Sequence, residues 1–272
     1  MKKFEIGVGM FGDLAFDKET GKFADAQQKL QQILAEIKLA DELGIDVFAL
    51  GEHHRPDYVV SSPEMVLSAA ASITKNIKLM SAVTVLSSAE PVKVYQDFST
   101  LDLISGGRAE IGVGRGSFIE SFPLFGYDLD DYHELFEEKL DLLLKINTQE
   151  NVTWKGKLRA PMENQTVYPR ATNNGRLPVW IAVGGTPESV LRAARLGLPL
   201  VVAIIGGLPK QFKPLIAYYK QEYLKNGHNP DEMQIGIHSH TLVSENPEVI
   251  DGYFENYAAQ MNRIGSSRGW SA

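Results

Sequence analysis

The sequence contains no cysteine. Disulfide bonds, thiolate nucleophiles and cysteine-ligated metal ions or iron–sulfur clusters are therefore excluded. The sequence also lacks an excess of positive charge, because 27 lysines and arginines stand against 34 aspartates and glutamates, for a formal net charge of −7. Nucleic acids and anionic membranes attract basic surfaces, so we expect neither as a partner.

Long apolar runs are missing as well. No stretch approaches the roughly 18 apolar residues that a transmembrane helix requires. The N-terminal segment MKKFEIGVGMFGD has two lysines, but Glu5 and several glycines interrupt its apolar residues. This pattern is typical of a first strand rather than of a signal peptide, and we therefore expect a cytoplasmic protein.

The sequence does contain a regular alternation of short β-branched or glycine-bounded segments with longer helical stretches. This alternation predicts repeated βα units around a parallel sheet. A helix follows each of seven expected strands, which lie at about residues 4–9, 46–51, 77–85, 109–114, 178–183, 199–204 and 233–243. Residues 150–177, with extended stretches around Pro161 and an NNGR turn, interrupt the alternation. We interpret them as an insertion within a single domain that spans residues 1–272.

Seven units are one short of the eight that close a TIM-type (β/α)8 barrel. An open doubly wound sheet shows the same alternation of strands and helices. The pattern favours the barrel, with its eighth βα unit missing from this chain, and leaves the doubly wound sheet as the alternative. In a barrel of this type the active site lies at the carboxyl ends of the strands.

Glu52, His53 and His54 directly follow the second expected strand. Two histidines beside an acid could serve in acid–base catalysis, belong to a metal site, or be ordinary loop residues. Adjacent side chains of an extended segment point to opposite faces, which argues against a shared metal ion. His238 and His240 share one face of the last expected strand, where packing is favoured over metal binding.

A glycine-rich segment, GVGRGSF, runs from Gly112 to Phe118 at the end of the fourth expected strand. Its glycines, including Gly114, would let a ligand approach the backbone, and Arg115 could bind an anionic group. The alternative is a glycine-rich turn with a surface arginine. The spacing G-x-G-x-G differs from the dinucleotide-binding fingerprint.

The segment VGGTPES lies between the fifth expected strand and its helix. Gly184 and Gly185 leave their amides accessible, and Thr186 is placed as the residue that precedes the helix. Pro187 suits the first helical position, and Ser189 can turn its hydroxyl toward the same pole. This arrangement predicts a phosphate site at the helix N-terminus, with a plain capped helix as the alternative.

Taken together, these segments resemble the bacterial luciferase-like monooxygenases. The resemblance follows the chain in order through GEHH, SAVTVLSSAEPVKVYQDFSTLDLISGGRAEIGVGRGS, FPLFGYD, PVWIAVGGTPESVLRAARLGLPLVV and NYAAQMNRIGSSRGW. It implies a TIM-type barrel and a flavin-dependent oxidoreductase. Relatives with the last of these segments continue for about one more strand and helix, whereas this chain ends at Ala272.

The resemblance also implies roles for individual residues. His53 matches the active-site histidine near the reacting edge of the flavin. Ala82 and Val83 match the position of a non-proline cis peptide bond beneath the flavin ring. The remaining expected cofactor-binding residues, of which the last four match positions that hold the flavin phosphate, are Gly114, Arg115, Gly185, Thr186 and Ser189.

The activity that the resemblance implies is a monooxygenase reaction. Reduced FMN would activate dioxygen for transfer of one oxygen atom to a small organic substrate, so that the cofactor carries most of the chemistry. His53 would act as acid or base, and no metal ion is required. The resemblance further implies a separate flavin reductase and a homodimer. The alternatives are a deazaflavin-dependent hydride-transfer enzyme, a non-catalytic flavin-binding protein and a barrel metallohydrolase.

Overall fold

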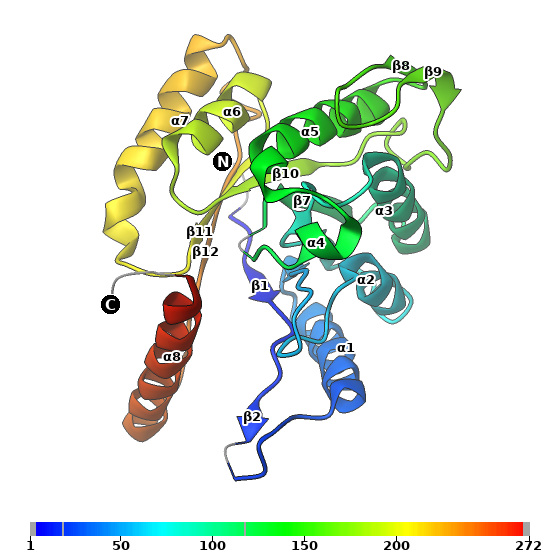
Figure 1. Cartoon of the computed structure of the whole chain (residues 1–272). Helices are drawn as coiled ribbons and strands as arrows, with labels where there is room; N and C mark the ends of the chain where they lie inside the picture. Colours follow the sequence, from blue (N-terminus) through cyan, green and yellow to red (C-terminus); the bar gives the residue numbers. More distant parts are fainter. Residues whose placement is uncertain (1–3, 18, 117, 269–272) are drawn as a thin grey trace.

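The computed structural model describes residues 4–17, 19–116 and 118–268. Ser117 of the GVGRGSF segment and the last residues of the NYAAQMNRIGSSRGW segment lie outside the described residues. At the centre is a parallel sheet (Figure 1) with the spatial order β1 (Gly7–Met10), β4 (Val47–Leu50), β5 (Lys78–Ser81), β7 (Ala109–Gly114), β10 (Val179–Val183), β11 (Leu200–Ile204) and β12 (Ile235–Ser239). All seven expected strands are therefore present.

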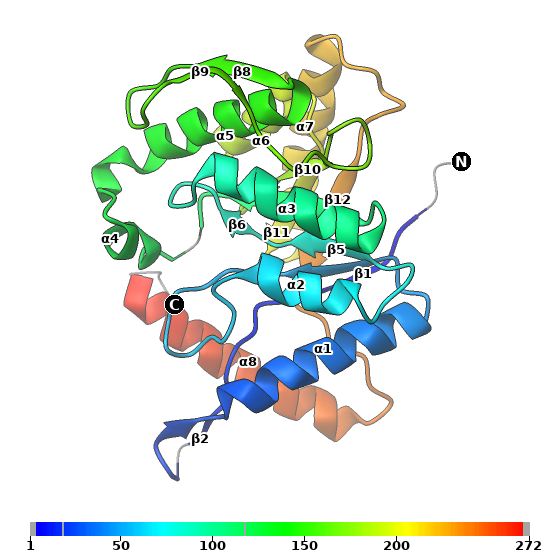
Figure 2. The same cartoon turned by 90° about the vertical axis from the view of Figure 1, so that its right-hand side faces the viewer.

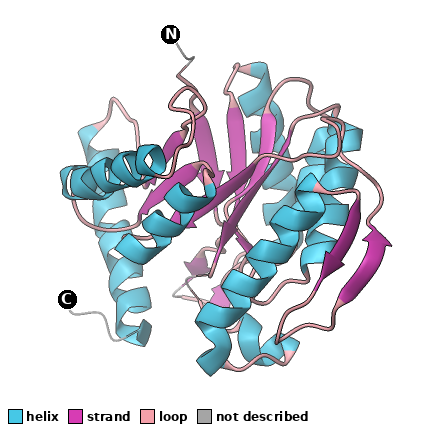
Figure 3. Cartoon of the chain, turned by 90° about the horizontal axis from the view of Figure 1, so that it is seen from above, coloured by secondary structure: helices cyan, strands magenta, loops and turns pink. Residues whose placement is uncertain are grey.

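The strands follow one another around the sheet in the same order as in the sequence. In an open doubly wound sheet this order would reverse near the middle, so the structure excludes that alternative. The helices lie outside the strands (Figure 3). They are α1 (Ala26–Glu42), α2 (Pro63–Ala71), α3 (Pro91–Ser105), α5 (Tyr132–Thr148), α6 (Pro187–Leu196), α7 (Lys213–Lys225) and α8 (Pro247–Arg268).

β1 and β12 form the two ends of the sheet, and no other strand among the described residues pairs with their outer edges. The two ends approach each other through side chains, since a β-carbon on Gly9 would lie 2.7 Å from Nε2 of His238. Phe11, which follows β1, packs against His238 with ring centroids 5.6 Å apart. The expected barrel fold is thus confirmed as a nearly closed barrel of parallel strands.

The expected strand at residues 77–85 is divided into β5 and a short β6 (Thr84–Val85), which pairs with β7. The peptide bond between Ala82 and Val83 separates the two pieces and is cis. The cis bond that the family resemblance implies is therefore confirmed. Counted as one interrupted strand, β5 and β6 complete the set of seven.

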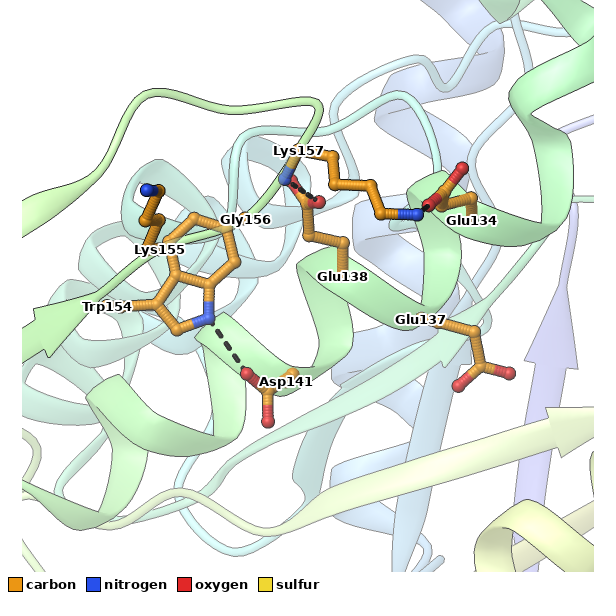
Figure 4. A pocket seen from close by; sticks show the side chains of 8 residues that line it. All are labelled: Glu134, Glu137, Glu138, Asp141, Trp154, Lys155, Gly156 and Lys157. Atoms are coloured by element: carbon orange, nitrogen blue, oxygen red, sulfur yellow. Dashed lines mark hydrogen bonds and ion pairs between the residues drawn. The ribbon is translucent and has the colours of Figure 1, made fainter.

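The expected insertion at residues 150–177 contains an antiparallel hairpin, β8 (Asn151–Trp154) and β9 (Met162–Thr166). Figure 2 shows α1, α2 and α3 in successive rows, with the hairpin against α5 beyond them. Nε1 of Trp154 donates a hydrogen bond to Asp141 of α5 across 2.8 Å. A surface cleft of about 530 Å³ between the hairpin and α5 contains this contact (Figure 4).

A few small elements were not expected. They are the hairpin of β2 (Phe16–Asp17) and β3 (Lys22–Phe23), the short helix α4 (Ser121–Phe125), and the 3-10 turn η1 (Leu129–Asp131). A second 3-10 turn, η2 (Pro209–Phe212), leads directly into α7. In the described part of the chain, no helix has both the length and the apolar character to span a membrane.

Candidate functional site

The loops that follow β1 and β4 are joined by backbone hydrogen bonds at the carboxyl ends of these strands. The amide of Leu14 donates to the carbonyl of Asp57 across 2.9 Å, and the amide of Val59 donates to the carbonyl of Gly12 across 2.8 Å. The amide of His53 in turn donates to the carbonyl of Val60 across 2.8 Å. These bonds fix the backbone on either side of His53.

Gly51, the last residue before the Glu52-His53-His54 motif, permits a close approach of three groups. A β-carbon at this position would lie 2.8 Å from Cδ1 of Phe11, 3.1 Å from the carbonyl oxygen of Ala82 and 3.1 Å from Cε1 of His53. The absence of a side chain therefore brings His53 and the cis peptide to the same spot, as the resemblance predicts.

Aromatic rings surround His53. Tyr58 stacks on its imidazole with centroids 4.1 Å apart and an interplanar angle of 14°. Phe11 and Phe118 meet the imidazole edge-on, at 5.4 Å and 5.3 Å. Sequence reasoning did not identify these three rings, because they belong to three different loops and no motif links them.

His53 is neutral at neutral pH. Burial lowers its pKa from 6.5 to about 4, although the nearby Asp57 carboxylate acts in the opposite direction. Its Nδ1 atom is buried and has no hydrogen-bond partner among the described residues. A neutral imidazole with an unpaired nitrogen can accept a hydrogen bond or a proton from a bound molecule.

Glu52 and His54 support this arrangement from the other side of the backbone. Oε1 of Glu52 lies 2.7 Å from Nε2 of His54, and Oε2 accepts a hydrogen bond from the amide of Val85 across 2.8 Å. The His54 ring packs edge-on against Phe125 at 5.2 Å. His53 and His54 thus have separate surroundings, as the alternation of side chains along an extended segment predicts.

The glycines at the end of β7 make room for a neighbouring segment of this chain. A β-carbon on Gly112 would lie 2.1 Å from the carbonyl oxygen of Ser81, and one on Gly114 would lie 2.9 Å from Cγ2 of Val83. Our interpretation that these glycines leave space for a ligand needs correction, because β5 and the cis peptide already fill that space. A cofactor-binding role for Gly114 stays a prediction.

Arg115, Thr186 and Ser189 lie together at the N-terminus of α6. Nη2 of Arg115 donates to Oγ of Ser189 across 3.3 Å, and the Thr186 hydroxyl donates to the same oxygen across 2.8 Å. Thr186 is the residue that precedes the helix, as expected, but its side chain makes no hydrogen bond to the helix backbone. Nη1 of Arg115 also contacts Nδ1 of His133 at 2.9 Å, a partner that no sequence signal indicated.

Backbone amides at the N-terminus of α6 are available as hydrogen-bond donors. Within the described chain, the amides of Gly185, Thr186 and Glu188 form no hydrogen bond to protein groups. Free amides and the positive pole of a helix favour an anion, and a guanidinium adds a charged partner. The residues present therefore fit a phosphate group.

His238 and His240, which share one face of β12 and its extension, both pack against Phe11, at 5.6 Å and 6.1 Å. Burial lowers the pKa of both histidines. Among the described residues, no group of three or more histidine, aspartate or glutamate side chains is arranged to hold a metal ion.

A nearly closed α/β barrel, with His53 and the N-terminus of α6 at the carboxyl ends of its strands, has the architecture of the TIM-barrel enzymes. This chain belongs to the luciferase-like monooxygenase family, whose family model matches residues 10–269. The expected family is therefore confirmed, and the match covers nearly the whole chain.

Curated relatives agree with this assignment. The chain is 29% identical over 245 residues to the uncharacterized protein y4wF of Sinorhizobium fredii, covering 90% of this chain and 69% of that protein. It is 26% identical over 229 residues to the alkanal monooxygenase alpha chain of Photorhabdus laumondii, covering 81% of this chain and 62% of the relative. The chain thus spans about two thirds of the length of these relatives.

Solved structures share the fold. The monooxygenase RslO1 from Streptomyces bottropensis superimposes with a TM-score of 0.86 at 23% identity, covering 97% of this chain and 79% of the other. The oxygenating constituent of 3,6-diketocamphane monooxygenase from Pseudomonas putida, in complex with FMN, gives 0.78 at 21%, covering 98% and 80%. An F420-dependent secondary alcohol dehydrogenase gives 0.71 at 19%, covering 86% and 68%.

Proposed function

We propose that this protein is an FMN-dependent monooxygenase that transfers one oxygen atom of dioxygen to a small organic substrate. The observation that carries the proposal is the convergence of Arg115, Thr186 and Ser189 at the N-terminus of α6. FMN has a phosphate at one end and a flat apolar ring at the other. The N-terminus of α6 suits the phosphate, and the aromatic surroundings of His53 suit the flavin ring.

The phosphate would be held by the Arg115 guanidinium, the Thr186 and Ser189 hydroxyls, and the free amides of α6. Ser189 is buried, so its hydroxyl is already withdrawn from water and its orientation is set by two donors. A preorganised site of this kind loses little side-chain freedom when an anion binds.

When bound, the flavin supplies the reaction with dioxygen, and the chain supplies the surroundings. The rings of Tyr58, Phe11 and Phe118 exclude water from the imidazole of His53. Because the imidazole is neutral, His53 can accept a proton from the substrate or hold a hydrogen bond to it. His53 is our candidate for the acid–base residue.

Reduced flavin would come from a separate flavin reductase, and the enzyme would act as a homodimer. Both expectations follow from the family resemblance and belong to the proposal.

A deazaflavin is the second candidate cofactor. One of the similarly folded proteins is an F420-dependent dehydrogenase, and a second is described in complex with FMN. The phosphate-binding groups of this chain suit either cofactor. With a deazaflavin, the reaction would be a hydride transfer and would not consume dioxygen.

Binding and turnover distinguish these functions. The purified protein would be titrated with FMN, riboflavin and a deazaflavin, with quenching of cofactor fluorescence as the readout. We expect FMN to bind more tightly than riboflavin, which lacks the phosphate. Formation of an oxygenated product would then be measured with FMN, a flavin reductase, dioxygen and a panel of aldehydes, ketones and thioethers, because free reduced flavin consumes dioxygen by itself. Equal binding of FMN and riboflavin would contradict the proposed phosphate site, and FMN binding without product from any substrate would favour a non-catalytic flavin-binding protein.

A further inference from the structure

Arg55 connects two separate segments of the chain close to His53. Its Nε donates to Oδ1 of Asp57 across 2.9 Å, and its Nη1 donates to Oε1 of Glu120 across 2.6 Å. The guanidinium carbon also lies 4.7 Å from the centre of the Phe118 ring. One side chain in the loop between β4 and α2 is thereby bound to the segment that leads into α4.

Each of these two segments supplies one ring to His53. Tyr58 follows Asp57 directly and stacks on the imidazole at 4.1 Å. Phe118 lies two residues before Glu120 and meets the imidazole edge-on at 5.3 Å. Tyr58 and Phe118 also contact each other, with centroids 5.8 Å apart. The contacts of Arg55 therefore tie together the two segments that carry these rings.

We propose that Arg55 is a positioning residue, which holds Tyr58 and Phe118 against His53 and thereby keeps the imidazole out of water. The catalytic meaning of this arrangement rests on the proposed function of His53. The arrangement itself involves only side chains of this protein and can be tested without cofactor.

The chemistry of arginine suits this task. A planar guanidinium can donate to two carboxylates in different directions while its flat face lies on an aromatic ring. A lysine ammonium in the same place keeps the positive charge, but it is a compact point charge that cannot reproduce this geometry. Arg55→Lys therefore separates the positioning role from the effect of charge.

A second arginine provides a matched control. Nε of Arg159 donates to Oε1 of Glu90 across 2.9 Å, and the Arg159 side chain is 24% exposed, the same value as for Arg55. None of the ring contacts of His53 involves this pair. Arg159→Lys makes the same chemical change at the same degree of burial.

The test is a histidine NMR titration of the whole 272-residue chain without cofactor. The Cε1–H signal of His53, assigned with His53→Gln, is followed from pH 3.5 to 8 in the wild type, Arg55→Lys and Arg159→Lys. We expect the midpoint of His53 to rise by about one pH unit or more in Arg55→Lys, because water gains access to the ring. Arg159→Lys should titrate as the wild type does.

In Arg55→Lys, a carboxylate that loses its arginine partner could raise the His53 midpoint through its charge alone. A further variant, Glu120→Ala, tests for this effect. It leaves the ion pair of Arg55 with Asp57 intact and deletes a negative charge, a change that by Coulomb's law alone would lower the midpoint. A rise in Glu120→Ala would run against this direct effect of the lost charge and would indicate greater exposure of His53. This variant also decides the question if Arg55→Lys does not fold.

The other titratable or charged groups near His53 must be included in the interpretation. They are His54, Arg55 and Asp57 on its own loop, Asp13 after β1, Glu120 before α4, and His238 and His240 across Phe11. Arg55→Lys leaves the net charge of this set of groups unchanged, and Glu120→Ala removes one negative charge from it.

An unchanged His53 midpoint in both Arg55→Lys and Glu120→Ala would overturn the inference. A shift of the same size in Arg159→Lys would also overturn it, because the effect would then be a general response to the loss of an ion pair. Failure of FMN to bind would contradict the proposed function but would leave this titration, which uses no cofactor, intact.

Discussion

Arg115 donates a hydrogen bond from Nη2 to Oγ of Ser189 across 3.3 Å and so joins the end of β7 to the first turn of α6, 74 residues further along the chain. The family resemblance predicts that both residues bind the flavin phosphate. The fold brings these two predicted phosphate ligands together from elements far apart in the sequence.

Replacing Arg115 tests this site. Arg115→Ala removes a charge-assisted contact and should weaken FMN binding by about 1.5–3 kcal/mol, roughly 10- to 150-fold. Riboflavin binding should change little, because riboflavin has no phosphate. Fluorescence titration of both ligands gives the answer, with Arg159→Ala as the control at an ion pair that shares no partner with Arg115. Equal losses for FMN and riboflavin would show that Arg115 does not bind the phosphate.

Gly114 offers a test of packing at the cis peptide. A β-carbon would lie 2.9 Å from Cγ2 of Val83, closer than two methyl-type carbons normally approach, so Gly114→Ala should lower the free energy of unfolding by about 1–3 kcal/mol. At Gly206 a β-carbon meets nothing within 4 Å, and Gly206→Ala is the matched control. Urea unfolding measures both. Equal stabilities for the two variants would contradict the tight contact.

The sequence alone predicts the barrel strands well, because strands of a parallel sheet are short apolar segments bounded by turn residues. β7, which is buried along its whole length, shows this most clearly. The β2–β3 hairpin could not be predicted in the same way, because each of its strands has two residues and both are exposed. The cis bond at Ala82–Val83 came from the family resemblance, since nothing in the local sequence favours it.

The candidate site was predictable only in part. The helix begins at Pro187 with Thr186 before it, as the sequence predicts, and the anion site expected there stays a prediction. The rings around His53 and the bond from Arg55 to Glu120 could not be predicted, because they join residues on different loops, 65 positions apart in the latter case. Such contacts depend on how the loops fold over the barrel rim, which has no local signature.

His53 is the residue on which proposed turnover depends. His53→Gln keeps a polar side chain of similar reach but cannot act as an acid or base near neutral pH. We expect product formation with FMN, reductase and oxygen to fall by about 10²- to 10⁴-fold, whereas FMN affinity should change less than threefold. His54→Gln is the control variant, because His54 is the adjacent residue but makes separate contacts. A variant at His53 that turns over at the wild-type rate would remove the histidine from the mechanism.

The same histidine should make stability depend on pH. Burial lowers its pKa from 6.5 to about 4, so the folded protein binds this proton less readily than the unfolded chain does. Above pH 6.5 the residue is neutral in both states, and its contribution is fully present. As the pH falls from 6.5 toward 4, the unfolded chain takes up the proton first, and the free energy of unfolding decreases by about 1.4 kcal/mol for each pH unit.

His238 and His240 act in the same direction, because burial lowers their pKa values too. Urea unfolding of the wild type and His53→Gln at pH 7, 6 and 5 should therefore give a steeper loss of stability for the wild type. The two curves should converge toward low pH, since the variant has one fewer group to protonate in the unfolded chain. Parallel curves across this range would mean that His53 gains its proton equally well in the folded protein, and that the rings of Tyr58 and Phe118 do not shield it from water.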